Sequence, residues 1–158
     1  INSQLLQLEK KKQGREQYVI MMIDLDHFKS INDHYGHIMG DQVLMNVAKV
    51  LRDTVRHTDI VGRYGGEEFL IIFKNIDTNA VHAIAERCRQ SLYELEHRID
   101  YTYVSYVSAS IGVAFSQADM NVMQVVQAAD AALYQAKAQG RNRICFAPQV
   151  QESVIPLV

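Results

Sequence analysis

The 158-residue sequence has no tryptophan, two prolines, two cysteines and little excess of either charge. Cys88 and Cys145 do not form a CxxC pair, so we interpret them as reduced, partly buried thiols. Sixteen basic residues against 18 acidic residues give a net charge of −2, unlike a general nucleic-acid binder. No apolar run approaches the roughly 20 residues needed to span a bilayer, and no signal peptide opens the chain. These absences favour a cytoplasmic domain that does not bind nucleic acid.

A length of 158 residues suits one folded domain. With 48% of its residues hydrophobic, the chain can bury a sizeable core. The first residue is Ile1 rather than Met, so we expect a piece of a longer protein. Residues 1–17 are polar and rich in lysine, and we interpret them as the remnant of an upstream linker. We expect the domain proper over residues 18–147 and a loose tail over residues 148–158.

The spacing of apolar residues predicts an α+β fold. A continuous apolar run at 18–23 predicts a strand buried on both faces. Further strands are expected at 60–64, 67–73, within 103–115 and at 143–146, and helices at 27–34, from about 40 to 55, at 80–95 and at 121–139. Gly65 and Gly66 predict a hairpin with a primed turn, whose residues have positive φ. This order favours helices packed on a mostly antiparallel sheet of about five strands.

Two pairs of acidic residues indicate a metal site. Asp24 and Asp26 end the apolar strand, where carboxylates are costly unless a cation or hydrogen bonds satisfy them. Glu67 and Glu68 follow the glycine turn, and Asp24 and Glu67 converge if the hairpin packs beside the first strand. Hard oxygen ligands of this kind suit Mg²⁺ or Mn²⁺, usually shared with substrate phosphates. Either pair alone is typical of ordinary surface carboxylates, but both together favour a metal.

Other polar residues have the chemistry of a nucleotide site. Lys29 could contact a phosphate, and Asn32 and Asp41 could bind a guanine edge. Lys137 and Arg141 are four residues apart, so they are expected to share a face near a helix end and could clamp a triphosphate. Solvated lysines, a helix cap at Asp41 and a solvated basic face are the alternatives. Taken together, the residues indicate a metal-assisted nucleotide enzyme.

Several segments resemble the motifs of the GGDEF family, in its GGEEF form. They are DLDHFKSIND at 24–33, YGH at 35–37, GD at 40–41, RYGGEEF at 63–69, SIGVA at 110–114, ADAALYQAK at 129–137 and GRNR at 140–143. The resemblance extends from about residue 18 to residue 146, with the motifs in the family's order and spacing. The family's opening motif is represented at most by residues 1–3, with Ser3 where an arginine is usual. We therefore expect the chain to begin inside that motif, after an upstream sensor or dimerising segment.

The resemblance implies a diguanylate cyclase, which joins two GTP molecules into cyclic di-GMP and releases pyrophosphate while acting as a homodimer. Asp24, the Leu25 carbonyl and Glu67 would bind two Mg²⁺ or Mn²⁺ ions per active site. Glu67 or Glu68 would act in deprotonating the ribose 3′-hydroxyl, and Lys29 would steady the phosphates. The substrate-binding residues implied by the resemblance are Phe28, Lys29, Asn32, His37, Asp41, Gly65, Gly66, Lys137 and Arg141.

The resemblance also implies feedback inhibition by the product. Arg56 and Asp59 are similar to the family's R-x-x-D inhibitory site, and Arg87 matches a second contact. A surface Arg–Asp pair at a helix end is the alternative, and such a pair contributes little to stability. The resemblance places the domain in the cytoplasm, with a sensor domain upstream that could anchor the full-length protein in a membrane.

Two other functions stay open at this point. The chain could be an inactive module that binds GTP or cyclic di-GMP, although inactive members commonly lose the metal aspartate or the glycine motif. It could also make a mononucleotide or mixed dinucleotide product, although Asp41 favours guanine.

Overall fold

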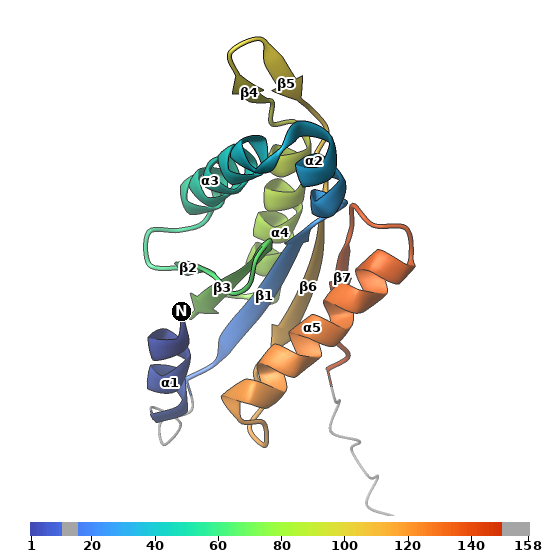
Figure 1. Ribbon diagram of the computed structural model, residues 1–158. Coiled ribbons are helices and arrows are strands. Elements are labelled where there is room, and N and C mark those ends of the chain that lie inside the picture. Colours follow the sequence, from blue (N-terminus) through green and yellow to red (C-terminus); the bar gives the residue numbers. More distant parts are fainter. Residues whose placement is uncertain (11–15, 150–158) are drawn as a thin grey trace, which may run out of the picture.

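The computed structural model describes residues 1–10 and 16–149 (Figure 1). Its helices are α1 (Asn2–Lys10), α2 (Phe28–Tyr35), α3 (His37–Thr54), α4 (Thr78–Tyr93) and α5 (Val122–Ala138). Its strands are β1 (Tyr18–Leu25), β2 (Ile60–Arg63), β3 (Glu68–Lys74), β4 (His97–Ile99), β5 (Thr102–Val104), β6 (Ala109–Phe115) and β7 (Ile144–Phe146). Within these residues, no helix combines the length and the apolar character that crossing a membrane requires.

A five-stranded sheet in the order β2-β3-β1-β6-β7 forms the centre of the molecule. All pairs are antiparallel except β6 with β7, which confirms the expected mostly antiparallel sheet. Every residue of β1 is buried, as the continuous apolar run predicts for a central strand covered on both faces. The expected α+β architecture is therefore confirmed.

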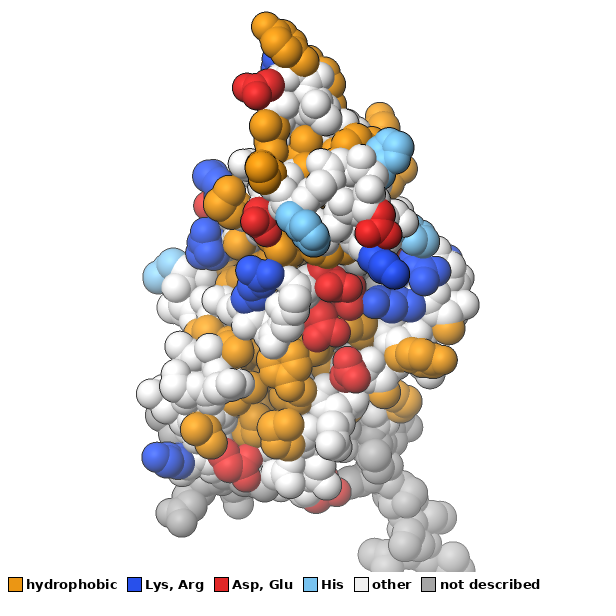
Figure 2. Space-filling model, in the orientation of Figure 1, with side chains coloured by type: hydrophobic (Ala, Val, Ile, Leu, Met, Phe, Trp, Pro, Cys, Tyr) orange, Lys and Arg blue, Asp and Glu red, His pale blue; other side chains and the backbone are white. Residues whose placement is uncertain are grey.

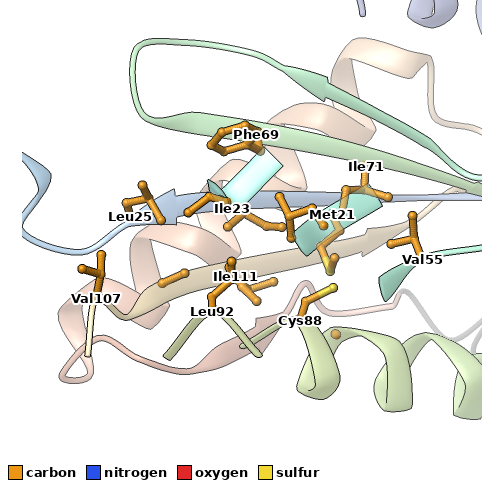
Figure 3. Packing of buried hydrophobic residues seen from close by; sticks show 14 of the residues in the cluster. Met21, Ile23, Leu25, Val55, Phe69, Ile71, Cys88, Leu92, Val107 and Ile111 are labelled. Carbon is orange, nitrogen blue, oxygen red and sulfur yellow. The ribbon is translucent and has the colours of Figure 1, made fainter. Parts of the chain in front are cut away.

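Side chains of β1 alternate between two hydrophobic clusters. Met21, Ile23 and Leu25 face α3 and α4 (Figure 3). Ile20 and Met22 face α1 and α5 on the opposite side of the sheet. Since the side-chain period of a strand is two, Asp24 continues the row that faces α5.

Helix α5 packs unusually close to β6. A Cβ at Gly112 would lie 2.1 Å from the carbonyl oxygen of Ala129 and 2.2 Å from the backbone nitrogen of Leu133. Only glycine leaves room for the α5 backbone at this point. The contact fixes the height of α5 above the sheet and so positions the residues near its C-terminal end.

Two expectations about the hairpin and the helix boundaries need correction. The β2–β3 hairpin forms, but residues 64–67 connect the strands and neither Gly65 nor Gly66 has a positive φ. The four-residue connection does not need the primed two-residue turn that the Gly-Gly pair suggested. Helix α3 begins at His37, three residues before the expected start, because Gly36 at φ 88° separates it from α2.

The expected long strand region within 103–115 divides into two parts. Strand β5 pairs with β4 in a separate hairpin, and only β6 joins the main sheet. The hairpin projects beyond the α2–α3 pair in Figure 1. Its strands are three residues long, too short to give a clear alternation of apolar and polar residues.

The segments outside the predicted domain are partly described. Helix α1 lies within 1–17 and contacts α5, with Leu5 and Leu8 buried between them. Of the predicted tail, residues 148 and 149 have no regular structure and residues 150–158 lie outside the described residues. The domain boundaries stay a prediction.

Candidate active site

The end of β1 carries two buried carboxylates, with Asp24 5% and Asp26 4% exposed. The Nζ atom of Lys137 lies 2.8 Å from one oxygen of Asp24, while the other oxygen, Oδ1, is buried without a hydrogen-bond partner. A buried anionic oxygen without a partner is costly, so this position suits a cation. The chemistry of the Asp24 side chain thus fits the divalent metal predicted from the sequence.

The two glutamates of the glycine loop have different surroundings. Glu68 lies directly opposite Asp24 in the β1–β3 register, whereas the backbone carbonyl of Glu67 accepts a hydrogen bond from Leu25 N–H at 3.4 Å. Burial raises the pKa of the Glu68 carboxyl, the charges of Asp24 and Asp130 raise it further, and Lys137 opposes them. The strand register and the electrostatic interaction therefore both put the Glu68 side chain beside Asp24. The prediction from the sequence is that Glu67 converges with Asp24.

The glycine loop itself is compact. The N–H groups of Tyr64 and Gly65 both donate to the carbonyl oxygen of Glu68, at 2.8 and 3.3 Å. The Arg63 guanidinium folds over the loop and donates to the Gly66 carbonyl at 2.6 Å. A Cβ at Gly65 would lie 3.0 Å from an oxygen of Glu68, whereas one at Gly66 would meet nothing within 4 Å. Within the loop, only the backbone of Gly65 therefore lies tightly against the Glu68 carboxylate.

The predicted guanine-binding residues lie together on the α2–α3 pair. A Cβ at Gly40 would lie 1.8 Å from the Asn32 side-chain oxygen, so Asn32 lies directly against the turn that carries Asp41. Asp41 also lines a cavity of about 540 Å³, whose wall includes Leu44 of α3, Val61 of β2 and Phe69 of β3. This volume is within the range of small-molecule sites.

Three further predicted contacts lie on the same two helices, α2 and α3. Phe28 is buried at the first position of α2, and Lys29 is exposed next to it. His37 is exposed at the first position of α3.

The predicted basic clamp has a different geometry from the one expected. Helix α5 ends at Ala138, so Lys137 is in the helix but Arg141 lies beyond it, in a turn with φ 65°. The two residues therefore do not share a helical face, because Gly140 ends the helix. Figure 2 shows acidic side chains beside a group of Lys and Arg side chains on this face of the molecule.

Asp130 is a residue of this region to which the sequence reasoning assigned no role. It lies on α5 seven residues before Lys137, which places both on one side of the helix, and its charge acts on Glu68. The seven-residue spacing of Asp130 and Lys137 is the feature of the sequence that indicates their common side of the helix. Among residues 1–10 and 16–149, no three histidine, cysteine or acidic side chains lie close enough to hold a metal on their own.

Two of the three predicted inhibitory residues, Arg56 and Asp59, form a tight structural contact. The Arg56 guanidinium donates to both oxygens of Asp59, at 2.7–3.1 Å, and to the carbonyl oxygen of Lys74 at 2.8 Å. The Asp59 side chain is fully buried, while the Arg56 side chain is 37% exposed. Arg87 is exposed on α4. The Arg56–Asp59 pair therefore joins the loop after α3 to the end of β3, whether or not it also binds a ligand.

Comparison with known proteins identifies relatives of the whole domain. The family model described as "Diguanylate cyclase, GGDEF domain" matches residues 1–143. Diguanylate cyclase A of Treponema denticola is 44% identical over 131 residues, covering 82% of this chain and 35% of the relative. The cyclic di-GMP phosphodiesterase PdeR of Escherichia coli is 36% identical over 137 residues, covering 85% of this chain and 20% of that protein.

A solved structure has the same fold. The GGDEF domain of DgcB from Caulobacter crescentus, in complex with c-di-GMP, superimposes with a TM-score of 0.85 at 32% identity, covering 92% of this chain and 89% of that one. The chain spans only about a third, or less, of the length of the two curated relatives.

Proposed function

Because the chain belongs to the diguanylate cyclase GGDEF domain family, we propose that it condenses two GTP molecules into cyclic di-GMP with release of pyrophosphate. The observation that carries the proposal is the buried Asp24, whose Oδ1 has no partner, beside Glu68 at the end of β1. The two carboxylates lie at the C-terminal end of β1, the central strand of the sheet, where Lys137 of α5 contacts Asp24.

The metal-binding groups in this proposal are Asp24, the Leu25 carbonyl and Glu67, holding two Mg²⁺ or Mn²⁺ ions together with substrate phosphates. Such ions lower the pKa of a bound 3′-hydroxyl and neutralise charge that develops on the phosphate. Glu67 or Glu68 accepts the proton of the 3′-hydroxyl.

Base recognition falls to Asn32 and Asp41. A carboxylate accepts two parallel hydrogen bonds from the N1–H and N2 amino groups of guanine. The cavity beside Asp41 offers an apolar wall for the ring. Phe28 on α2 and His37 on α3 are further contacts in this proposal.

Phosphate binding falls to three cations and the glycine loop. Lys29 on α2, Lys137 on α5 and Arg141 after α5 come from three different segments. Lys137 pairs with Asp24 in the structure, so in this proposal it exchanges that partner for phosphate when substrate and metal bind. Gly65 and Gly66 let the loop backbone approach the nucleotide without an intervening Cβ.

One domain offers one guanine site, so the reaction needs two copies. We place two domains face to face as a homodimer, in which the 3′-oxygen of each GTP attacks the α-phosphate of the other. Bringing the two reactants together is a large part of the catalysis. An upstream sensor domain would control this pairing, and cyclic di-GMP bound at Arg56, Asp59 and Arg87 would inhibit it.

The main alternative is an inactive module that binds GTP or cyclic di-GMP. Product analysis after incubation of the dimerised domain with GTP, ATP and Mg²⁺ separates the possibilities. Cyclic di-GMP alone supports the proposal, and a mixed dinucleotide would contradict the guanine assignment. Binding of GTP with no product from the folded dimer would favour the inactive module.

A further inference from the structure

Three consecutive residues after α5 have positive φ angles: Gly140 at 122°, Arg141 at 65° and Asn142 at 46°. This region of backbone space is unfavourable for residues with a Cβ, although asparagine tolerates it better than arginine. The Arg141 N–H donates to the Ala136 carbonyl at 3.0 Å, and the Gly140 N–H donates to the Lys137 carbonyl at 3.3 Å. These two bonds form a Schellman motif, which ends the helix but leaves Asn142 to be held by other groups.

The buried carboxylate of Asp26, next to the sheet, binds the backbone of Asn142. Its Oδ2 accepts the Asn142 N–H at 3.0 Å and the Ser108 hydroxyl at 2.6 Å, and its Oδ1 accepts the Ser110 hydroxyl at 2.7 Å. A buried carboxylate is stable only when such bonds satisfy it, and bonds to a charged acceptor are the stronger kind. Asp26 therefore joins the end of β1, the start of β6 and the turn after α5.

A second contact holds the same turn from α4. The Arg89 guanidinium donates to the side-chain oxygen of Asn142 at 2.9 Å and is itself bound to Glu86 at 3.0 Å. The side chain and the backbone of Asn142 are thus fixed by different elements, and Arg141 directly precedes this fixed residue.

We propose that Asp26 is a positioning residue for phosphate binding, because it holds the left-handed turn from which Arg141 reaches the triphosphate of GTP. The inference rests on the proposed phosphate role of Arg141. It assigns the two acidic residues of the D-L-D segment to different tasks: Asp24 faces the metal and substrate, and Asp26 orients the turn that carries Arg141.

Calorimetric binding of a non-hydrolysable GTP analogue with Mg²⁺, and of guanosine, tests this role. Asp26→Ala is expected to weaken the affinity for the analogue by about tenfold, the order of one lost charge-assisted contact. The affinity for guanosine, which has no phosphate, stays unchanged. Asp26→Asn is the matched control, because its amide can accept from Asn142 and Ser108 and donate to the Ser110 hydroxyl; its affinity stays near that of the wild type.

A double-mutant cycle with Arg141→Ala completes the test. If Asp26 acts through Arg141, Asp26→Ala has no further effect on analogue binding once Arg141 is replaced. Equal losses in both backgrounds, or an equal loss of guanosine affinity, would overturn the inference. If Arg141→Ala alone leaves analogue binding unchanged, the phosphate role of Arg141 is the part that fails.

Should Asp26→Ala not fold by circular dichroism, the Ser108→Ala, Ser110→Ala double variant replaces it. This variant removes the two hydroxyl donors that orient the carboxylate. It should lower the affinity for the GTP analogue by a smaller factor than Asp26→Ala, and again only when Arg141 is present.

Discussion

At the residue scale, Asp24 and Asp26 show how neighbouring groups decide what a carboxylate does. Both are buried and lie two residues apart, Asp24 in β1 and Asp26 in the turn that follows it. Asp26 is satisfied by three hydrogen bonds from the fold, whereas Asp24 has one ion pair and a buried oxygen without a partner. The first arrangement stabilises a structure, and the second is suited to a ligand.

Replacement of the proposed metal ligands should abolish turnover without unfolding the domain. Asp24→Asn and Glu67→Gln each remove a hard anionic ligand and leave the side-chain volume nearly unchanged. We expect product formation to fall by at least about 100-fold, the scale of a lost charge-stabilising group at a transition state. Near-normal rates in either folded, purified variant would show that the metal assignment is wrong.

Replacement of the guanine-binding carboxylate should change base preference. Asp41→Asn presents an NH₂ group to the donors of guanine, and an unpaired donor in the complex costs roughly 1–3 kcal/mol. GTP affinity should therefore fall about fivefold to 150-fold, while the weak ATP affinity changes little. Titration calorimetry that gives equal GTP affinity for wild type and variant would remove Asp41 from the site.

At the element scale, the proposed inhibitory site also supports the fold. Arg56 ties the loop after α3 to β3, so Arg56→Ala should lower the melting temperature by about 2–4 °C, the shift that about 1 kcal/mol gives in a domain of this size. Arg87 is exposed on α4, and Arg87→Ala should leave the melting temperature unchanged.

Both variants should relieve inhibition by added cyclic di-GMP while keeping most of the uninhibited rate. The comparison separates ligand binding from stability, because only Arg56→Ala loses a structural contact. An inhibition curve identical to that of the wild type in both variants would show that this site does not regulate the enzyme.

The β4–β5 hairpin should respond to acid through His97. Its ring is fully buried, its Nδ1 lies 3.1 Å from the Asn46 amide, and burial lowers the pKa of the imidazole. The unfolded chain, with a histidine pKa of about 6.5, therefore binds a proton that the folded chain resists. Stability should be unaffected above that pH and fall as the pH decreases below it.

Urea denaturation at pH 7.5 and 5.5 measures this effect. Between these two pH values, the free energy of unfolding should fall more for the wild type than for His97→Gln, which cannot titrate. The other histidines are present in both proteins, so their contributions cancel. An equal loss in both proteins would exclude His97 as the cause.

The sequence predicts the elements better than it predicts their junctions. The continuous apolar run of β1 and the helical spacing of α3 to α5 are correctly predicted, because each pattern extends over many residues. The β2–β3 hairpin is correctly predicted from the Gly65-Gly66 pair, although its turn type is not. The β4–β5 hairpin is too short to show a pattern, and the turn at Arg141 depends on contacts from Asp26 and Arg89 that are distant in sequence. The pairing of Glu68 with Asp24 likewise follows from strand register, which the sequence does not reveal.

At the scale of the whole molecule, the sheet brings the proposed site together at one end. β1 and β3 contribute carboxylates, and α2 and α3 contribute the base-binding groups and Lys29. The end of α5 and the turn after it contribute Lys137 and Arg141. The close contact at Gly112 fixes α5, so the cations stay in register with the carboxylates. A site of this kind binds one nucleotide, and the proposed reaction requires a second copy of the domain.

The most direct test is product formation by the domain in isolation and in a forced dimer, the latter made by fusion to a dimeric coiled coil. With GTP and Mg²⁺, the forced dimer should form cyclic di-GMP and two pyrophosphates per product, at a rate per domain that is independent of protein concentration. The isolated domain should show a rate per domain that rises with concentration. A folded dimer that binds GTP with Mg²⁺ but forms no cyclic di-GMP would contradict the proposed function.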